Sequence, residues 1–297
     1  MIPPLPKGYV CVRSPRPPRL DGRLEGPEWD LAPWTDDFVD ISTLVKPRFR
    51  TRVKMLWDEH ALYIGAEMEE PHVWATLTEQ DSVIFHDNDF EVFLDPDGDH
   101  ADYLEFEVNA FGTPWDLRLP YPYRAGGGEL PYKIEGLRVG VHINGTINDP
   151  RDEDHGWSVV IAWPWEDVRE WCKGHCPPLP GEVWRINFSR VEWEHDVVKG
   201  QYVKRKKPED NWVWSPQGVV DMHRPWMWGR LQFAQTTEPL KDDPDWNDRM
   251  TLVAAWESRG HSVPEGVTVS GVGESWKARR GAWIIDAHSR LHSLSVR

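Results

Sequence analysis

The sequence has little cysteine, no long apolar run and a deficit of positive charge. Its three cysteines in 297 residues do not form the even-numbered set of a disulfide framework. No apolar stretch is long enough to span a bilayer, so we expect no association with a membrane. Acidic residues (49) outnumber basic ones (34), which argues against a nucleic-acid partner because such proteins need a basic surface.

The amino-terminal residues, Met-Ile-Pro-Pro-Leu-Pro-Lys, contain no apolar signal region. We therefore expect a cytoplasmic protein unless a signal peptide has been removed. The segment Cys172-Lys-Gly-His-Cys176 resembles half of a zinc site, but no second cluster of ligands accompanies it. Free thiols after a short helix at 164–171 are the preferred interpretation. The sequence does not indicate an oligomeric state.

Tryptophan is abundant instead, with 19 residues. Its large amphipathic ring fills β-sheet cores and also stacks on flat ligand surfaces. So many tryptophans cannot all contact a ligand, and we expect most of them to lie in the core.

Short segments that alternate apolar and polar residues recur along the chain and predict β-strands. The clearest pair, 51–57 and 61–69, flanks the turn Asp58-Glu-His60 and predicts a hairpin. Further strands are predicted at 137–143, 157–162, 183–190 and 229–233. Many short strands with few helices are typical of an all-β fold, here an antiparallel β-sandwich.

The two ends of the chain differ from this pattern. Residues 1–19 are rich in proline and arginine and predict an extended arm, which leaves 20–238 for the β-sandwich. In the remainder, 239–297, Trp246, Met250, Val253 and Trp256 have helical spacing, and strand-like runs follow them. We predict a small C-terminal appendage of one helix and a hairpin.

The functional hypothesis depends on residues 86–109, where two predicted strands each have one apolar face. Their opposite faces carry Asp89 and Glu91 in the first strand and Glu105, Glu107 and Asn109 in the second. Pairing the apolar faces brings the acidic faces together, although like-charged pairs cost roughly 0.2–1 kcal/mol each. An arginine, a metal ion or a polar ligand is therefore expected to offset this charge.

The strand at 183–190 supplies a candidate partner, because Arg185 and Asn187 share its polar face. If this strand joins the same sheet, both residues face the glutamates. The first hypothesis is a sheet with one face on the core and a charged site on the other. The alternative is a solvated outer face balanced by ordinary surface ion pairs.

The loop between the two acidic strands is rich in oxygen donors, with Asp95, Asp97, Asp99 and Asp102. Calcium takes 6–8 oxygen ligands, and alternating aspartates can supply several of them. Asp95, Asp97 and Asp99 are therefore a candidate calcium site, although the later glutamate of an EF-hand is missing. A polar hairpin loop without metal is the alternative.

The order of several motifs resembles that of family 9 carbohydrate-binding modules, whose β-sandwich is DOMON-like and of jelly-roll type. Over about residues 15–235 these motifs include Leu20-Asp-Gly-Arg-Leu-Glu-Gly-Pro-Glu-Trp29, Asp89-Phe-Glu-Val-Phe-Leu-Asp95, Phe106-Glu-Val-Asn109 and Pro225-Trp-Met-Trp-Gly-Arg-Leu-Gln-Phe233. The resemblance implies carbohydrate binding, and calcium in the loops.

In the xylanase-attached members two tryptophans sandwich a terminal sugar. Phe85 takes the first of these positions here, and Met222-His223 takes the second, so the clamp is not reproduced residue for residue. Trp115, Trp212, Trp214 and Trp226 are candidates for a different clamp.

We therefore expect a saccharide partner, bound by aromatic stacking and hydrogen bonds. The candidate binding residues are the charged, amide and aromatic side chains near the acidic strands and the resembling positions: Phe85, His86, Asp87, Asp89, Glu91, Glu105, Glu107, Asn109, Trp115, Asp116, Arg185, Asn187, Arg190, Trp212, Trp214 and His223. For Trp212 and Trp214, stacking on a sugar and packing in the core both stay open.

Two other functions also stay open. A glycoside hydrolase or lyase could use Glu105, Glu107 or His223 as catalytic residues. Glu105 and Glu107 have Cα atoms about 6.6 Å apart on one strand face, and carboxyl pairs about 5–9.5 Å apart hydrolyse glycosides. A protein-interaction module on the same fold is the third possibility.

Overall fold

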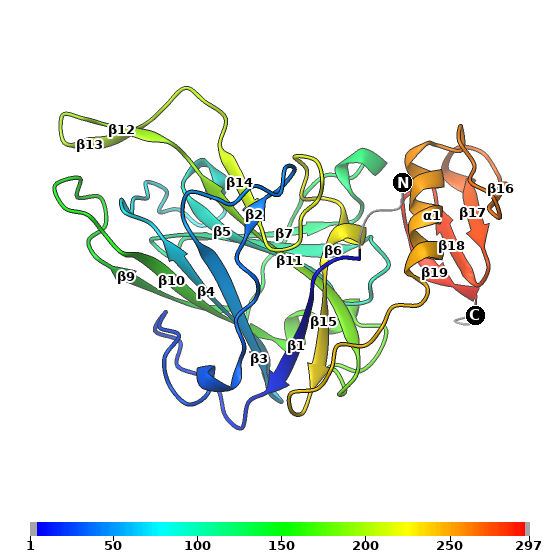
Figure 1. The fold of residues 1–297 in the computed structure, drawn as a ribbon, viewed down its shortest axis with the longest axis horizontal. Helices are drawn as coiled ribbons and strands as arrows, with labels where there is room; N and C mark the ends of the chain where they lie inside the picture. Colours follow the sequence, from blue (N-terminus) through cyan, green and yellow to red (C-terminus); the bar gives the residue numbers. More distant parts are fainter. Residues whose placement is uncertain (1–4, 295–297) are drawn as a thin grey trace.

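The computed structural model describes residues 5–294, and β-strands are its main regular secondary structure (Figure 1). One large sheet contains 13 strands. They are β1 (Gly8–Arg13), β2 (Val39–Asp40), β3 (Thr51–Trp57), β4 (Ala61–Glu69), β5 (Asp89–Asp95), β6 (Tyr103–Asn109), β7 (Pro114–Leu119), β8 (Leu130–Pro131), β9 (Arg138–Asn144), β10 (Gly156–Pro164), β11 (Val183–Glu192), β14 (Asp210–Val213) and β15 (Gly229–Ala234).

The sheet curls over a shared core to form the predicted β-sandwich (Figure 1). Its strand order is β8-β7-β6-β5-β11-β15-β1-β3-β4-β10-β9. Outside this order, β14 pairs with β11, and β2 pairs with β14. Apolar side chains from β5, β6 and β11 on one side and from β3, β4 and β10 on the other belong to one core cluster. Burying these faces is the main favourable term for folding.

The first described strand corrects one expectation. Residues 1–19 were expected to be an extended arm, but Gly8–Arg13 form β1, which lies inside the sheet. Tyr9 and Cys11 point into the core, and the backbone pairs with β15 and β3. Both pairings are parallel, whereas the rest of the sheet is antiparallel. Residues 1–4 of the expected arm, and 295–297 of the expected appendage, lie outside the described residues.

The local predictions for the hairpin at β3 and β4 agree with the observed bounds, and Asp58 makes its turn by accepting the backbone NH groups of His60 and Ala61. The helix expected at 164–171 is instead two 3₁₀ turns, Trp165–Asp167 and Arg169–Trp171. Val168 between them has φ −121°, which interrupts helical geometry. The thiols of Cys172 and Cys176 donate to the carbonyl groups of Val168 and Trp165.

The C-terminal appendage contains more strand than expected. Helix α1 (Trp246–Glu257) packs on an antiparallel sheet of four strands rather than one hairpin. The strands are β16 (Thr268–Ser270), β17 (Lys277–Arg280), β18 (Trp283–Asp286) and β19 (Leu291–Ser293). In the part of the chain that the structure describes, no helix is long and apolar enough to cross a membrane.

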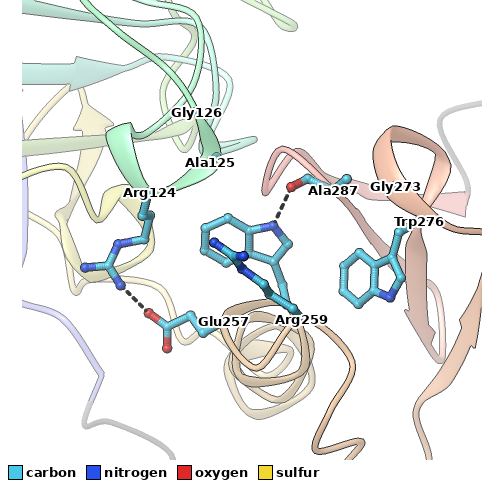
Figure 2. A pocket seen from close by; sticks show the side chains of 9 residues that line it. Arg124, Ala125, Gly126, Glu257, Arg259, Gly273, Trp276 and Ala287 are labelled. Atoms are coloured by element: carbon cyan, nitrogen blue, oxygen red, sulfur yellow. Dashed lines mark hydrogen bonds and ion pairs between the residues drawn. The ribbon is translucent and has the colours of Figure 1, made fainter.

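The appendage packs against one end of the sandwich (Figure 1). Trp226 of the sandwich meets Trp256 of α1 edge to face, with ring centroids 5.4 Å apart. Figure 2 shows the pocket beside this contact, where Arg124 pairs with Glu257 at 3.0 Å. At the far end of the molecule a two-stranded hairpin projects outward, formed by β12 (His195–Val198) and β13 (Gln201–Lys204) (Figure 1).

Candidate functional site

Four neighbouring strands, β7, β6, β5 and β11, align their side chains in rows across one face of the sheet. In one row Ser189, Glu91, Glu107 and Trp115 are register partners. The next row begins with Asn187 and continues with Phe93, Glu105 and Leu117. Strand alternation therefore brings the glutamates of β5 and β6 to one surface, as the sequence predicted.

This surface is the floor of a pocket of about 520 Å³, which we name the acidic pocket. Residues from the strands and from the loops above them line it: Ile41, Phe85, Glu91, Phe93, Glu105, Glu107, Trp115, Leu117, Tyr123, Val191, Glu209, Asn211, Val220, Asp221, Met222 and His223. The pocket thus collects the acidic strands and both positions at which the sequence resemblance expects ligand-clamping side chains.

Aromatic rings form the walls of the acidic pocket. Phe85 and Trp115 stack with ring centroids 6.3 Å apart and an interplanar angle of 30°, and both are half-buried. On another wall Tyr123 meets His223 edge to face at 4.4 Å. Tyr103 and His223 are joined by a hydrogen bond of 2.9 Å between the phenol oxygen and Nδ1. Burial lowers the pKa of His223 to about 4, so its ring is neutral at neutral pH.

The carboxylates of the floor (Glu91, Glu105 and Glu107), and that of Asp89 on the same sheet face but outside the pocket lining, are buried and lack basic partners. Asp89, Glu91, Glu105 and Glu107 are 0%, 6%, 4% and 2% exposed. Within residues 5–294 none of the four forms an ion pair with a lysine, arginine or histidine. Burial raises the pKa of Glu91 to about 7. Burial, followed by the charge of Glu91, raises the pKa values of the other three well above the ordinary carboxyl range.

Backbone groups satisfy only part of this acidic cluster. Glu107 Oε2 accepts the NH group of Phe85 at 3.0 Å, and Asp89 Oδ1 accepts the NH group of Val191 at 3.1 Å. Asp89 Oδ2 and Glu105 Oε2 are buried without a hydrogen-bond partner. Buried oxygen atoms of this kind are rare in folded proteins and call for a ligand, an ion or water.

The arginines expected to offset the glutamates do not face them. Arg185 shares the correct face of β11 but lies one row beyond Glu105 and two rows beyond Glu91 and Glu107, opposite Asp95. Its guanidinium donates to the carbonyl of Trp228 at 3.1 Å. Arg190 lies on the opposite face of β11, where its guanidinium contacts Glu70 at 2.9 Å and Glu192 at 2.8 Å. The expectation that Arg185 offsets the acidic face was therefore wrong, and Arg190, a candidate binding residue, lies outside the pocket lining.

Several other expected binding residues hold the scaffold together. Asn187 exchanges hydrogen bonds with the backbone of Ser215, at 2.8 and 2.9 Å. Asn109 donates to Asp87 at 3.0 Å, and Asp87 in turn accepts the backbone NH groups of Thr76 and Leu77. These bonds tie the loop before β5 to the sheet, and none of the three candidate residues lines the acidic pocket.

The remaining candidates also lie outside the pocket lining. Trp212 and Trp214 are 3% and 1% exposed and pack in the main core, which settles the choice left open by the sequence. Trp226 belongs to the appendage cluster. Asp116 projects from the opposite face of β7 from Trp115 and accepts the NH group of Ile134. His86 is exposed, and its carbonyl accepts a hydrogen bond from Lys204.

The sequence did not single out four polar or aromatic residues of the lining: Tyr123, Glu209, Asn211 and Asp221. Asn211 lies in β14 and is the register partner of Val191 in β11. Predicting β14 as a strand next to β11 would therefore have placed Asn211 beside the site. Tyr123 and Asp221 come from loops that only tertiary packing brings to the pocket. Arg124 forms an ion pair with Asp221 and so links these two loops.

The aspartate loop, the candidate calcium site of the sequence, has its carboxylates close together but shared with protein cations. One carboxylate oxygen from each of Asp95, Asp97 and Asp99 lies within 4.8 Å of the others. Lys173 Nζ, however, is 3.0 Å from Asp97, and Arg290 Nε is 3.3 Å from Asp99. The same carboxylates accept backbone NH groups of their own loop. Calcium at this loop therefore stays a prediction, and within residues 5–294 the three carboxylates already have these cations and turn hydrogen bonds as partners.

Comparisons with known proteins agree with this architecture. Residues 20–120 match the family described as carbohydrate family 9 binding domain-like. No curated protein matches the sequence.

Solved structures give a similar picture. Two structures of a family 9 carbohydrate-binding module from Caldicellulosiruptor kristjanssonii, one with cellotriose and one with glucose, are 16% and 15% identical, with TM-scores of 0.51 and 0.50. Each covers 80% of this chain and 100% of its own. A candidate carbohydrate-binding protein from Bacteroides uniformis ATCC 8492 is 17% identical, with a TM-score of 0.53, and covers 77% of this chain and 99% of its own. The chain therefore has a region similar to carbohydrate family 9 binding domains, within a β-sandwich of the kind found in family 9 carbohydrate-binding modules.

Proposed function

We propose that this protein binds a saccharide in the acidic pocket. The observation that carries the proposal is the combination of stacked aromatic walls and a carboxylate floor in one opening. Sugars present apolar C–H faces and a rim of hydroxyl groups, so a saccharide site needs both surfaces. The volume of about 520 Å³ is within the usual range for small-molecule sites.

The relatives support the same proposal. The family matched by residues 20–120 is a carbohydrate-binding one, and the Caldicellulosiruptor modules were solved with cellotriose and with glucose. Phe85 and Met222-His223 stand at the two positions of the resembling tryptophan clamp, and they line the same pocket although they are far apart in the chain. A sugar clamp with different side chains is the simplest interpretation.

Each part of the pocket then has a role. Phe85 and Trp115 stack on the pyranose ring, and Tyr123 extends this contact at the mouth, where it is 44% exposed. Glu91, Glu105 and Glu107 accept hydrogen bonds from sugar hydroxyl groups.

The layout of the carboxylates favours binding over hydrolysis. Glycosidases place their two carboxyl groups on either side of the scissile bond. Glu91 and Glu107 are direct cross-strand partners, and Glu105 follows on the next row, so all three lie on one floor. A hydrolase or lyase would need a further group on the opposite wall, where His223 is the available candidate.

The test is isothermal titration of the protein with glucose, cellobiose, cellotriose and a uronic acid, followed by chromatography of the mixtures for cleavage products. We expect binding without turnover, and Trp115→Ala to weaken binding about tenfold, which is about 1.4 kcal/mol. The control is Trp34→Ala, because Trp34 is also half-buried but stacks on Arg52 outside the pocket. Equal losses in both variants, or no binding of any sugar, would refute the proposal.

A further inference from the structure

The floor of the acidic pocket, together with Asp89 beside it on the same face of β5, has the composition of a metal site. One carboxylate oxygen from each of Asp89, Glu91 and Glu107 lies within 4.8 Å of the other two. Calcium bonds to oxygen at about 2.3–2.6 Å, so two ligands on opposite sides of the ion are about 4.6–5.2 Å apart. A single ion can therefore contact all three carboxylates with little movement of the strands.

An independent observation also points to a ligand at this place. Asp89 is fully buried and Glu105 is 4% exposed, yet Asp89 Oδ2 and Glu105 Oε2 have no hydrogen-bond partner. Each side chain belongs to the same face of the acidic hairpin as Glu91 and Glu107. Unsatisfied buried oxygen atoms carry a desolvation cost that a cation would remove.

Within residues 5–294 no lysine, arginine or histidine forms an ion pair with these four carboxylates. In the aspartate loop, the other close acidic group, Lys173 and Arg290 neutralise the carboxylates. On the pocket floor the nearest arginines of β11 are engaged elsewhere, Arg185 with Trp228 and Arg190 with Glu70 and Glu192. The two clusters thus differ in whether a basic side chain neutralises the carboxylates, and only the cluster on the pocket floor is left to a metal ion.

We propose that Asp89, Glu91 and Glu107, with Glu105 beside them, bind a divalent cation that prefers oxygen ligands, with calcium the best match in size. The three carboxylates provide only part of the 6–8 oxygen ligands that calcium takes, so positions remain open toward the pocket. A further step, in which sugar hydroxyl groups fill these positions, rests on the proposed saccharide binding. The cation site itself does not.

The experiment begins with the full chain after treatment with EDTA. Titration with CaCl₂, MgCl₂ and MnCl₂ is followed by calorimetry and by the thermal midpoint. We expect calcium to bind and to raise the midpoint by several degrees. Glu91→Gln and Glu107→Gln should each weaken calcium binding at least tenfold, with circular dichroism confirming that they are folded. Two isosteric variants are used so that the misfolding of one does not end the test.

The matched control is Asp97→Asn, which removes one carboxylate from the other acidic cluster. It should leave calcium binding unchanged. The proposal is overturned if none of the three cations binds, or if Asp97→Asn abolishes binding while both glutamine variants keep it. A sugar titration with and without calcium follows. Calcium binding without any sugar binding would refute the proposed function and support the cation site. Sugar binding without any cation binding would support the proposed function and refute the cation site.

Discussion

Glu91 and Glu107 lie directly opposite each other on adjacent antiparallel strands, with both side chains on the same face of the sheet. Directly opposite like charges destabilise a sheet, and burial increases the effect because little water screens them. A structural sheet has no need of this arrangement. Its presence at the bottom of an aromatic-walled pocket is the relationship from which the functional proposals are built.

Removing one of these charges should stabilise the metal-free protein. We expect Glu91→Gln to raise the free energy of unfolding by about 1 kcal/mol at pH 8 in EDTA, because glutamine keeps the shape and removes the cost of burying an ionised carboxylate opposite Glu107. Urea denaturation measures the change. As a control, Glu25→Gln alters an acidic residue far from the floor and should change little. Destabilisation by Glu91→Gln would mean that the repulsion is already compensated in the metal-free protein.

A larger ring at the clamp position should tighten sugar binding. Phe85→Trp enlarges the surface that stacks on a pyranose and restores the residue type of the resembling modules, so we expect several-fold higher affinity by calorimetry. Phe111→Trp is the control because Phe111 is 43% exposed and lies outside the pocket. Unchanged affinity in Phe85→Trp would show that the ring of Phe85 does not contact the sugar.

Arg190 should matter for stability rather than for ligand binding. It is fully buried and pairs with Glu70 and Glu192. Breaking such a buried network costs about 3–5 kcal/mol because unpaired charges remain. Arg190→Gln should lower stability by this order. Arg205→Gln, which removes ion pairs of an exposed arginine, should cost about 0–1 kcal/mol. Similar small effects in both variants would contradict the structure at Arg190.

Asp116 should give the protein a measurable pH dependence. Burial raises its pKa to about 6, above the value of about 3.9 expected in the unfolded chain. The unfolded state therefore loses this proton first, so the contribution to stability is present below about pH 4 and is lost as the pH rises through 6.

Asp116→Asn removes this titration and keeps an oxygen that can accept the NH group of Ile134. We expect the variant to gain on the order of 2 kcal/mol over the wild type at pH 8 and to lose that advantage at pH 4. Chemical denaturation at both pH values measures it. A constant difference between the two proteins across this range would exclude the titration of Asp116 as the cause.

Strand periodicity explains what the sequence could predict. The hairpin of β3 and β4 and the shared face of Glu91, Glu105 and Glu107 follow from alternation within single segments, which needs no knowledge of distant contacts. Alternation also puts Arg190 on the opposite face from Arg185 and Asn187, as observed, so its choice as a binding residue did not follow from periodicity. Periodicity did not predict the position of Arg185 relative to the glutamates. It gives the face of a strand on which a side chain lies, but not the register that decides which residues of the neighbouring strand lie opposite.

The missed parts of the site depend on long-range packing. Tyr123 and Asp221 reach the pocket on loops whose paths are set by the appendage side of the sandwich, where Arg124 pairs with both Asp221 and Glu257. Likewise β1 is short and flanked by proline and arginine, so its place in the sheet depends on pairing with β15, more than two hundred residues later. No local pattern carries that information.

The parallel strand β1 also has a consequence for biosynthesis. It joins the two halves of the sandwich by hydrogen bonds to β3 on one side and to β15 on the other. During translation β1 is made more than two hundred residues before Ala234, the residue that completes its pairing with β15. Until then one edge of β1 has unpaired backbone groups that can pair with other chains. Pairing of β1 with β15 is a non-local contact, which forms slowly. The enclosure of β1 within the sheet thus has to wait for β15.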